Sequence, residues 1–232
     1  MEVASIPVEL SVEEFLRNPS FRRLKEEDVA HLIEKCRPLI EPKTVYMFSK
    51  VTGIEQDKVT LGGIHTFRSK ILADMLVCGQ TVAPHVVTIG PRLEQQIAEN
   101  AEGSILQNWV TEKIGDYALG KASARVRELL AKTLGEDVSS FSPGTGTGEL
   151  FSIEQQEVLF RLLDPPTNVG VHLTPSYLMV PRKSVSGILA ATSEGYVACQ
   201  YCPREKCENR KRPFSGMHAC MHTTSSNEYE ST

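Results

Sequence analysis

The chain has 232 residues, of which 41% are hydrophobic and 23% charged, and its formal net charge at pH 7 is −4. This composition is typical of an ordinary globular protein, and the length suits one large domain or two small ones. The weak negative charge gives no electrostatic footprint for nucleic acid, and no apolar run approaches the length of a membrane span. We therefore expect cofactor and protein partners, with neither nucleic acid nor a membrane among them.

The N-terminus carries no basic segment followed by an apolar core, so we expect a cytoplasmic protein. In a reducing compartment, six cysteines favour metal or redox use over a disulfide framework. Cys36 and Cys78 lie within apolar stretches and are expected to be buried thiols. The other four cysteines lie near the C-terminal end and need a separate explanation.

The first third of the chain predicts two short helices followed by strands. Ser11 followed by Glu14 is a capping-box pattern, and apolar residues recur at helical spacing up to Cys36, around a break at 18–20. The apolar run at 44–51 and the segment 58–61 then predict a pair of strands joined through a polar turn. Residues 85–89 predict another buried strand.

Apolar positions from Leu93 to Leu130 predict a long amphipathic helical stretch, interrupted at Gly103, Gly115 and Gly120. Residues 139–148 predict a loop, and residues 153–163 predict a helix that ends before two prolines. Strand-like segments follow at 169–180 and 185–191, and residues 223–232 predict a disordered polar tail. Helices and strands without regular alternation predict an α+β domain with helices packed on a twisted antiparallel sheet.

Cys199, Cys202 and Cys207 form a Cys-x2-Cys-x4-Cys run, which is a spacing suited to a single soft metal centre. Cys220 is the candidate fourth ligand. Zinc favours four ligands in a closed tetrahedron, and an iron-sulfur cluster also takes thiolates and carries one electron. Unligated thiols in a loop are the alternative, and a zinc ion that only pins the C-terminal segment is another.

The glycine-rich loop at 142–148 resembles a phosphate cradle, because glycines let backbone N–H groups approach an anion closely. It lacks the lysine that defines a nucleoside-triphosphate loop. A flexible loop that leads into a helix is an equally good interpretation of this segment.

One longer motif carries a family resemblance. Residues 173–187 read Leu-Thr-Pro-Ser-Tyr-Leu-Met-Val-Pro-Arg-Lys-Ser-Val-Ser-Gly. They resemble the Leu-Thr-x-Ser-x-x-Met-x-Pro-x-x-Ser-Val-Ser-Gly stretch of the activation domain of cobalamin-dependent methionine synthase. Residues 87–94, the long helix after them, and residues 142–144 are similar to small stand-alone relatives of that domain. The resemblance covers most of residues 1–200, and some relatives also carry a C-terminal Cys-x2-Cys-x4-Cys run.

In that family, the activation domain binds S-adenosylmethionine and closes over a corrinoid that has been oxidised to cob(II)alamin. One-electron reduction of the cobalt is then trapped by methyl transfer. The resemblance therefore implies a protein that reactivates a corrinoid methyltransferase on a separate chain, with methionine synthase as the expected partner. Cobalamin would be held by the partner, and a cysteine-bound cluster, itself reduced by an electron-donor protein, would supply the electron.

The family loop that holds S-adenosylmethionine reads Arg-Pro-Ala-x-Gly-Tyr, whereas this chain has Ser142, Pro143, Gly144, Thr145 and Gly146. The arginine suited to pairing the ligand carboxylate and the tyrosine are both absent. The resemblance therefore assigns the ligand to this loop through the backbone N–H groups of residues 144–146.

A second family segment, Tyr-Tyr-Ala-Val-Ala-Gln, is similar to residues 195–200, so the resemblance implies that Tyr196 stacks on the ligand or hydrogen-bonds to it. We expect an activation-domain-like unit over 1–198 and a cysteine-rich metal-binding extension over 199–222. The leading hypothesis is an activation component of a corrinoid methyltransferase. A non-enzymatic, zinc-stabilised docking module is the alternative, and an activator of a different corrinoid protein is a third.

Overall fold

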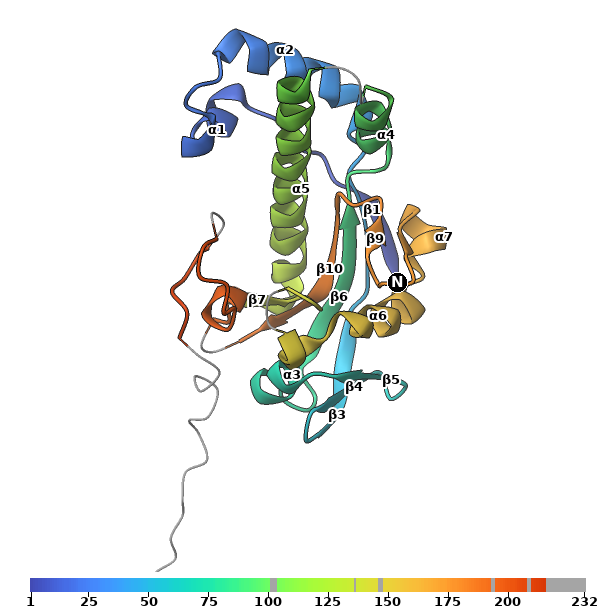
Figure 1. The fold of residues 1–232 in the computed structure, drawn as a ribbon. Helices are drawn as coiled ribbons and strands as arrows, with labels where there is room; N and C mark the ends of the chain where they lie inside the picture. The colour runs from blue at the N-terminus through green and yellow to red at the C-terminus, as the bar shows by residue number, and fades with distance from the viewer. Residues whose placement is uncertain (101–103, 136, 146–147, 193–194, 208–209, 216–232) are drawn as a thin grey trace, which may run out of the picture.

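The computed structural model describes residues 1–100, 104–135, 137–145, 148–192, 195–207 and 210–215. Within these ranges an antiparallel sheet curls between a long helix on one face and shorter helices on the other (Figure 1). The strands are β1 (Glu2–Ser5), β2 (Lys43–Tyr46), β3 (Ser49–Glu55), β4 (Lys58–Leu61), β5 (His65–Arg68), β6 (Thr81–Thr88), β7 (Val138–Phe141), β8 (His172–Leu173), β9 (Met179–Val180) and β10 (Ser184–Ala191). The α+β fold class predicted from the sequence is confirmed.

The helices cover both faces of this sheet. They are α1 (Val12–Leu16), α2 (Glu26–Cys36), α3 (Lys70–Met75), α4 (Arg92–Glu99), α5 (Ile105–Leu134), α6 (Gln156–Leu163) and α7 (Pro165–Val169). Short 3₁₀ turns lie at η1 (Pro19–Phe21), η2 (Arg37–Leu39), η3 (Gly148–Phe151), η4 (Ile153–Gln155) and η5 (Ala198–Gln200).

Strand β6 lies at the centre of the sheet. One of its edges pairs with β2 and β3 in turn, and the other pairs with β10 over the register Ser184↔Thr88 to Ala190↔Val82. The far edge of β10 pairs with β7. Because β2 continues to β1 while β3 continues to β4 and β5, the sheet divides at this edge and curls.

Side chains of β6 alternate between two cores. Ala83 and Val87 pack with α5 residues, whereas Val82 and Val86 belong to the core beneath α6. His85 is also buried, and burial lowers its pKa to about 4. The imidazole is therefore neutral at pH 7 and is part of the core.

The N-terminal segment forms a third core with α4 and the first half of α5. Ser11 caps α1 by accepting a hydrogen bond from the N–H of Glu14, which confirms the capping pattern. The rings of Phe15 and Phe21 stack at 4.5 Å on the two sides of the predicted break. Cys36 is buried as expected, but Cys78 is exposed in the turn before β6, so that prediction was wrong.

Three other predictions need correction. The run at 44–51 is two strands rather than one, because β2 ends at Tyr46 and β3 begins at Ser49 along the same edge of β6. Residues 139–141 belong to strand β7 rather than to a loop. Gly115 and Gly120 lie inside the unbroken helix α5, whereas the predicted break at Gly103 lies outside the described residues.

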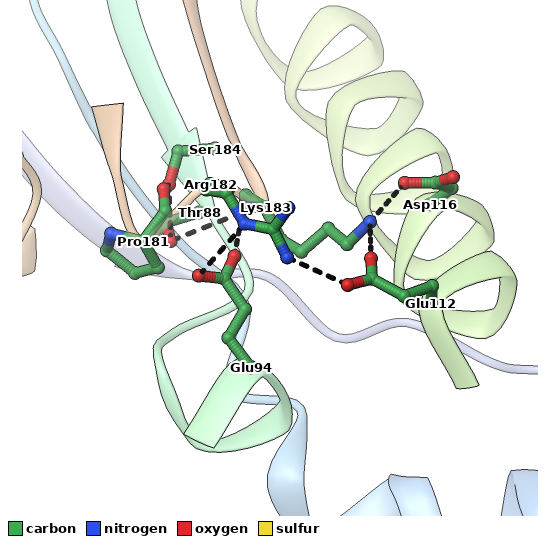
Figure 2. A network of polar contacts seen from close by, with 8 residues as sticks. All are labelled: Thr88, Glu94, Glu112, Asp116, Pro181, Arg182, Lys183 and Ser184. Atoms are coloured by element: carbon green, nitrogen blue, oxygen red, sulfur yellow. Dashed lines mark hydrogen bonds and ion pairs between the residues drawn. The ribbon is translucent and has the colours of Figure 1, made fainter. Parts of the chain in front are cut away.

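A partly buried polar network joins the start of β10 to α5 beside Gly115 (Figure 2). A Cβ on Gly115 would lie 2.8 Å from Leu93 Cδ2 and 3.2 Å from Lys183 Cε, so glycine lets both side chains pack against the helix. The Lys183 ammonium contacts carboxylate oxygens of Glu112 and Asp116, each at 2.6 Å. Glu94 accepts a hydrogen bond from the Lys183 backbone N–H at 2.6 Å, so α4 joins the network.

The ammonium stays charged despite its burial. Partial burial works to lower the pKa of Lys183, but hydrogen bonds to Asp116 and Glu112 outweigh it and raise that pKa above its ordinary value. Arg182 adds a second bond to Glu112 at 2.8 Å. The network therefore fixes the start of β10 against two helices.

Removing the Lys183 ammonium is expected to destabilise the fold. Lys183→Met leaves two carboxylates without their shared cation, and because these are only partly buried we expect a loss of about 2 kcal/mol, between the values for exposed and buried pairs. Lys113→Met is the control, since the exposed Lys113 lies 3.5 Å from the same Asp116 and should cost less than about 0.5 kcal/mol. Urea unfolding measures both, and equal losses would contradict this role.

Candidate functional site

The motif at 184–187 forms the first half of β10, and its polar groups are satisfied within the fold. The Ser184 hydroxyl donates to the Pro181 carbonyl at 2.7 Å, and its oxygen lies 2.9 Å from Thr88 Oγ1, within hydrogen-bond distance. The Ser186 hydroxyl donates to Gln156 Oε1 at 2.8 Å, which ties β10 to α6. The amide of Gln156 in turn donates to the carbonyl of Tyr177 at 3.1 Å. These serines hold secondary structure together.

Gly187 allows β7 to approach β10 closely. A Cβ at this position would lie 2.7 Å from the carbonyl oxygen of Phe141 and 2.8 Å from Ser142 Oγ. A side chain there would push against the residue that begins the glycine-rich loop. Gly187 therefore sets where this loop leaves the sheet.

The loop after Phe141 is the segment that the resemblance assigned to the ligand, and we call residues 142–145 the ligand loop. Pro143 is buried, whereas Gly144 and Thr145 are exposed. The N–H of Gly144 donates to the carbonyl of Phe151 at 2.9 Å, and the Thr145 hydroxyl donates to the Ser142 carbonyl at 2.8 Å. The N–H of Gly144 is therefore engaged within the protein, and Gly146 lies outside the described residues.

Gly144 has a conformation and a setting that favour glycine. Its φ is +74°, and an added Cβ would lie 2.9 Å from the Cβ of Ile153. The loop thus folds tightly back on the start of the next helical turn. This compact shape leaves Thr145 at its exposed end.

Tyr196 lies beside this loop in a stack of three aromatic rings. Its ring centroid is 4.6 Å from that of Phe141 and 5.4 Å from that of Tyr201, with nearly parallel planes. The Tyr196 side chain belongs to the main core and the residue is only 8% exposed. Little of its ring surface is open to a ligand, so contact through its edge fits this setting better than face-on stacking.

The backbone of Tyr196 is anchored to the sheet. Its N–H donates to Ser139 Oγ at 2.8 Å, and Ser139 Oγ is within hydrogen-bond distance of Thr192 Oγ1. All three residues are buried. Ser139 is on β7 and Thr192 follows β10, so two strands position this tyrosine.

The cysteine run follows directly, and we call residues 199–207 the cysteine loop (Figure 1). Arg210 holds it together through backbone carbonyls: its guanidinium donates to the carbonyl of Cys199 at 2.9 Å, to that of Cys202 at 3.2 Å, and to that of Arg204. A planar guanidinium with several donors suits such a multiple contact.

The thiol of Cys199 accepts a hydrogen bond from the backbone next to Arg210. The N–H of Lys211 lies 3.4 Å from its sulfur and lowers its pKa, and the charge of Arg210 acts in the same direction. Cys199, Cys202 and Cys207 are all half-buried and free of disulfides. Cys220 and the histidines at 218 and 222 lie outside the described residues.

The three thiols are not gathered around a common centre in the described part of the chain. Within those residues, no group of three or more His, Cys, Asp or Glu side chains is placed to hold a metal ion. The structure therefore gives no metal geometry, and the metal site stays a prediction from spacing. Across the same residues, no helix is both long and apolar enough to cross a bilayer.

A cavity of about 470 Å³ lies elsewhere, between α2, α4 and the start of α5. It is lined by Leu32, Lys35, Cys36, Leu39, Gln96, Ile97, Asn100, Ser104, Gln107, Asn108 and Thr111. The ligand loop follows β7, beyond the opposite end of α5 (Figure 1). The cavity is therefore separate from the site formed by Tyr196.

The arrangement of sheet, long helix and capping helices recurs in solved structures. One, the "Crystal Structure of the MetH Reactivation Domain bound to AdoHcy", superposes with a TM-score of 0.64 at 14% identity, over 85% of this chain and 80% of that one. At this identity the likeness defines the fold, which is that of a reactivation domain. No curated protein matches the chain significantly.

The family follows from the sequence profile described as vitamin B12 dependent methionine synthase, activation domain, which matches residues 87–212. This span is more than half of the chain and includes α4, α5, the ligand loop, β10, Tyr196 and the cysteine loop. The chain belongs to the activation-domain family of vitamin B12-dependent methionine synthase. The resemblance found in residues 173–187 is thus confirmed.

Sequence reasoning missed Arg210, Ser139 and Tyr201. Arg210 was only one of several basic residues near the cysteines, and its partners are backbone carbonyls, which leave no trace in a sequence pattern. Tyr201 lies inside the cysteine run and was overlooked as a spacer. Its position two residues after Cys199 and one before Cys202 is the signal that was available.

Adding a methyl group at Gly187 is expected to strain the start of the ligand loop. Gly187→Ala places a Cβ against the Phe141 carbonyl, and we expect destabilisation by roughly 1–3 kcal/mol in urea unfolding. Gly53→Ala in β3 is the matched strand control, because its Cβ would meet Thr60 at an ordinary 3.9 Å. Its stability should change by less than about 1 kcal/mol. Equal effects of the two substitutions would remove the close approach as the cause.

Proposed function

We propose that this chain reactivates cobalamin-dependent methionine synthase by S-adenosylmethionine-dependent remethylation of cob(II)alamin on a separate methyltransferase chain. The family match over residues 87–212 carries this proposal, and the reactivation-domain fold supports it. The cytoplasm is the proposed compartment. The reaction needs one electron and one methyl group: the cobalt gains the electron, then takes the methyl carbon as the carbon–sulfur bond breaks and the bonding pair stays on sulfur, which releases S-adenosylhomocysteine.

The residues of this chain would bind and orient the methyl donor. Gly144 and Thr145 are exposed and Pro143 is buried, and this loop directly follows Phe141, whose ring stacks on that of Tyr196. The ligand loop lacks the family arginine, so binding would depend on backbone groups, including those of residue 146, and on Tyr196. We name no general acid or base, because methyl transfer from a sulfonium needs positioning and exclusion of water rather than a proton.

We also propose that Cys199, Cys202, Cys207 and Cys220 bind a metal centre, either an iron-sulfur cluster that delivers the electron or a zinc ion. The spacing of the thiols supports this proposal. The N–H of Lys211 favours the thiolate of Cys199, and the bonds of Arg210 to the carbonyls of Cys199 and Cys202 fix the loop that carries it. The zinc case corresponds to the second candidate function, a docking module for a corrinoid protein.

The methyl-transfer proposal is tested by mixing the full chain with a corrinoid methyltransferase in its cob(II)alamin form, S-adenosylmethionine and a low-potential reductant. We expect methylcobalamin and S-adenosylhomocysteine to form together, and neither without S-adenosylmethionine. Formation of neither product with methionine synthase, but of both with another corrinoid protein, would move the assignment to that partner.

Loss of the Tyr196 hydroxyl is expected to weaken the binding of S-adenosylmethionine while the ring stack remains. Tyr196→Phe should raise Kd about two- to tenfold, which is the contribution of one hydrogen bond. Tyr117→Phe is the control, because this hydroxyl accepts the N–H of Ser11 on another part of the molecule. Calorimetric titration measures both, and an unchanged isotherm for Tyr196→Phe would remove its hydroxyl from the site.

Removal of one candidate ligand is expected to abolish metal binding. After anaerobic purification, Cys202→Ser should lose the metal of the unmodified chain, whereas Cys78→Ser, at an exposed thiol far along the sequence, should keep it. Elemental and sulfide analysis makes the measurement. Iron with acid-labile sulfide supports electron delivery, zinc alone supports the docking module, and no metal in the unmodified chain refutes the metal site.

A further inference from the structure

The aromatic stack joins the two loops of the candidate site. Phe141 directly precedes the ligand loop, and Tyr201 lies within the cysteine loop next to Cys202. Tyr196 contacts both rings, at centroid distances of 4.6 and 5.4 Å. Neighbouring rings therefore run without a gap from one loop to the other.

The two ends of this stack are held differently. On the ligand side, Phe141 is in the register of the sheet opposite Ile188, and the Tyr196 N–H is fixed to Ser139. On the other side, Tyr201 is buried in the main core, but residues 203–206 beside it are exposed. The packing of Tyr201 against Tyr196 is therefore one of the contacts that position the cysteine loop.

Arg210 makes the cysteine loop respond as one unit. Its guanidinium spans the carbonyls of Cys199, Cys202 and Arg204, on both sides of Tyr201. A displacement of Tyr201 would break these bonds together rather than one at a time. A ligand that steadies Tyr196 would equally steady the backbone that carries the thiols.

We propose that Tyr201 is a positioning residue that couples occupancy of the ligand loop to the conformation of the cysteine loop. This inference rests on the proposed binding of S-adenosylmethionine beside Tyr196. Binding of the methyl donor would hold the cysteine loop closed, and by thermodynamic reciprocity a fixed cysteine loop would favour the methyl donor. The accessibility of the Cys199 and Cys202 thiols would therefore depend on whether the methyl donor is bound.

The test is site-resolved alkylation of the reduced, chelator-treated full chain with iodoacetamide, followed by mass spectrometry, with and without saturating S-adenosylmethionine. We expect the ligand to slow modification of Cys199 and Cys202 about two- to tenfold, the factor that one aromatic contact provides. Cys78, which is exposed in the turn before β6, is the internal control and should react at the same rate in both samples.

Two substitutions separate coupling from simple folding. Tyr201→Phe keeps the ring and should retain the ligand-dependent protection, whereas Tyr201→Leu keeps apolar volume but removes the ring and should lose it. Cooperative unfolding of each variant is checked first. If Tyr201→Leu does not fold, the ratio of the rates at Cys199 and Cys78, with and without S-adenosylmethionine in the unmodified chain, still tests the coupling, and unequal protection in Tyr201→Phe would contradict a role for the ring alone.

The outcomes distinguish this coupling from the proposed function. A chain that shows no binding of S-adenosylmethionine in calorimetry overturns both. A chain that binds the ligand, yet shows unchanged or faster alkylation of Cys199, overturns the coupling alone. Protection that persists in a folded Tyr201→Leu variant overturns the role of Tyr201.

Discussion

The pairing of β10 with strands on both of its edges is the constraint on which the candidate site depends. One edge meets β6 over most of its length and the other meets β7, while α5 and α6 cover its two faces. A strand enclosed in this way cannot slip by one residue, since a slip would turn each buried side chain to the wrong face. Phe141 before the ligand loop, and Thr192 before Tyr196, are therefore placed by the interior of the sheet.

The motif that carries the family resemblance contributes to folding. Ser184 and Ser186 bond to neighbouring elements, Lys183 is enclosed by carboxylates, and Gly187 leaves room for Phe141. The ligand loop, by contrast, differs from the family pattern at its arginine.

Local patterns predicted the elements that have a local signal, such as the cap at Ser11 and the apolar run within β6. Predictions failed where a residue distant in the sequence determines the local structure. Gly115 was expected to break the long helix, yet it makes room for the side chains of Leu93 and of Lys183, which is far along the chain. In the candidate site, the cysteines and Tyr196 were identified by spacing and resemblance. Arg210 and Ser139 were not identified, because their partners are backbone carbonyl and N–H groups. Every residue type offers such groups, so no sequence pattern marks the contact.

Tyr196 and Tyr201 come late in the sequence, yet they fill the same core as Val45, Val51 and Phe67. The core over the early strands is therefore complete only after the cysteine segment has been synthesised, so we expect this core to form late during synthesis. A chain cut before these tyrosines would expose that face to chaperones and proteases.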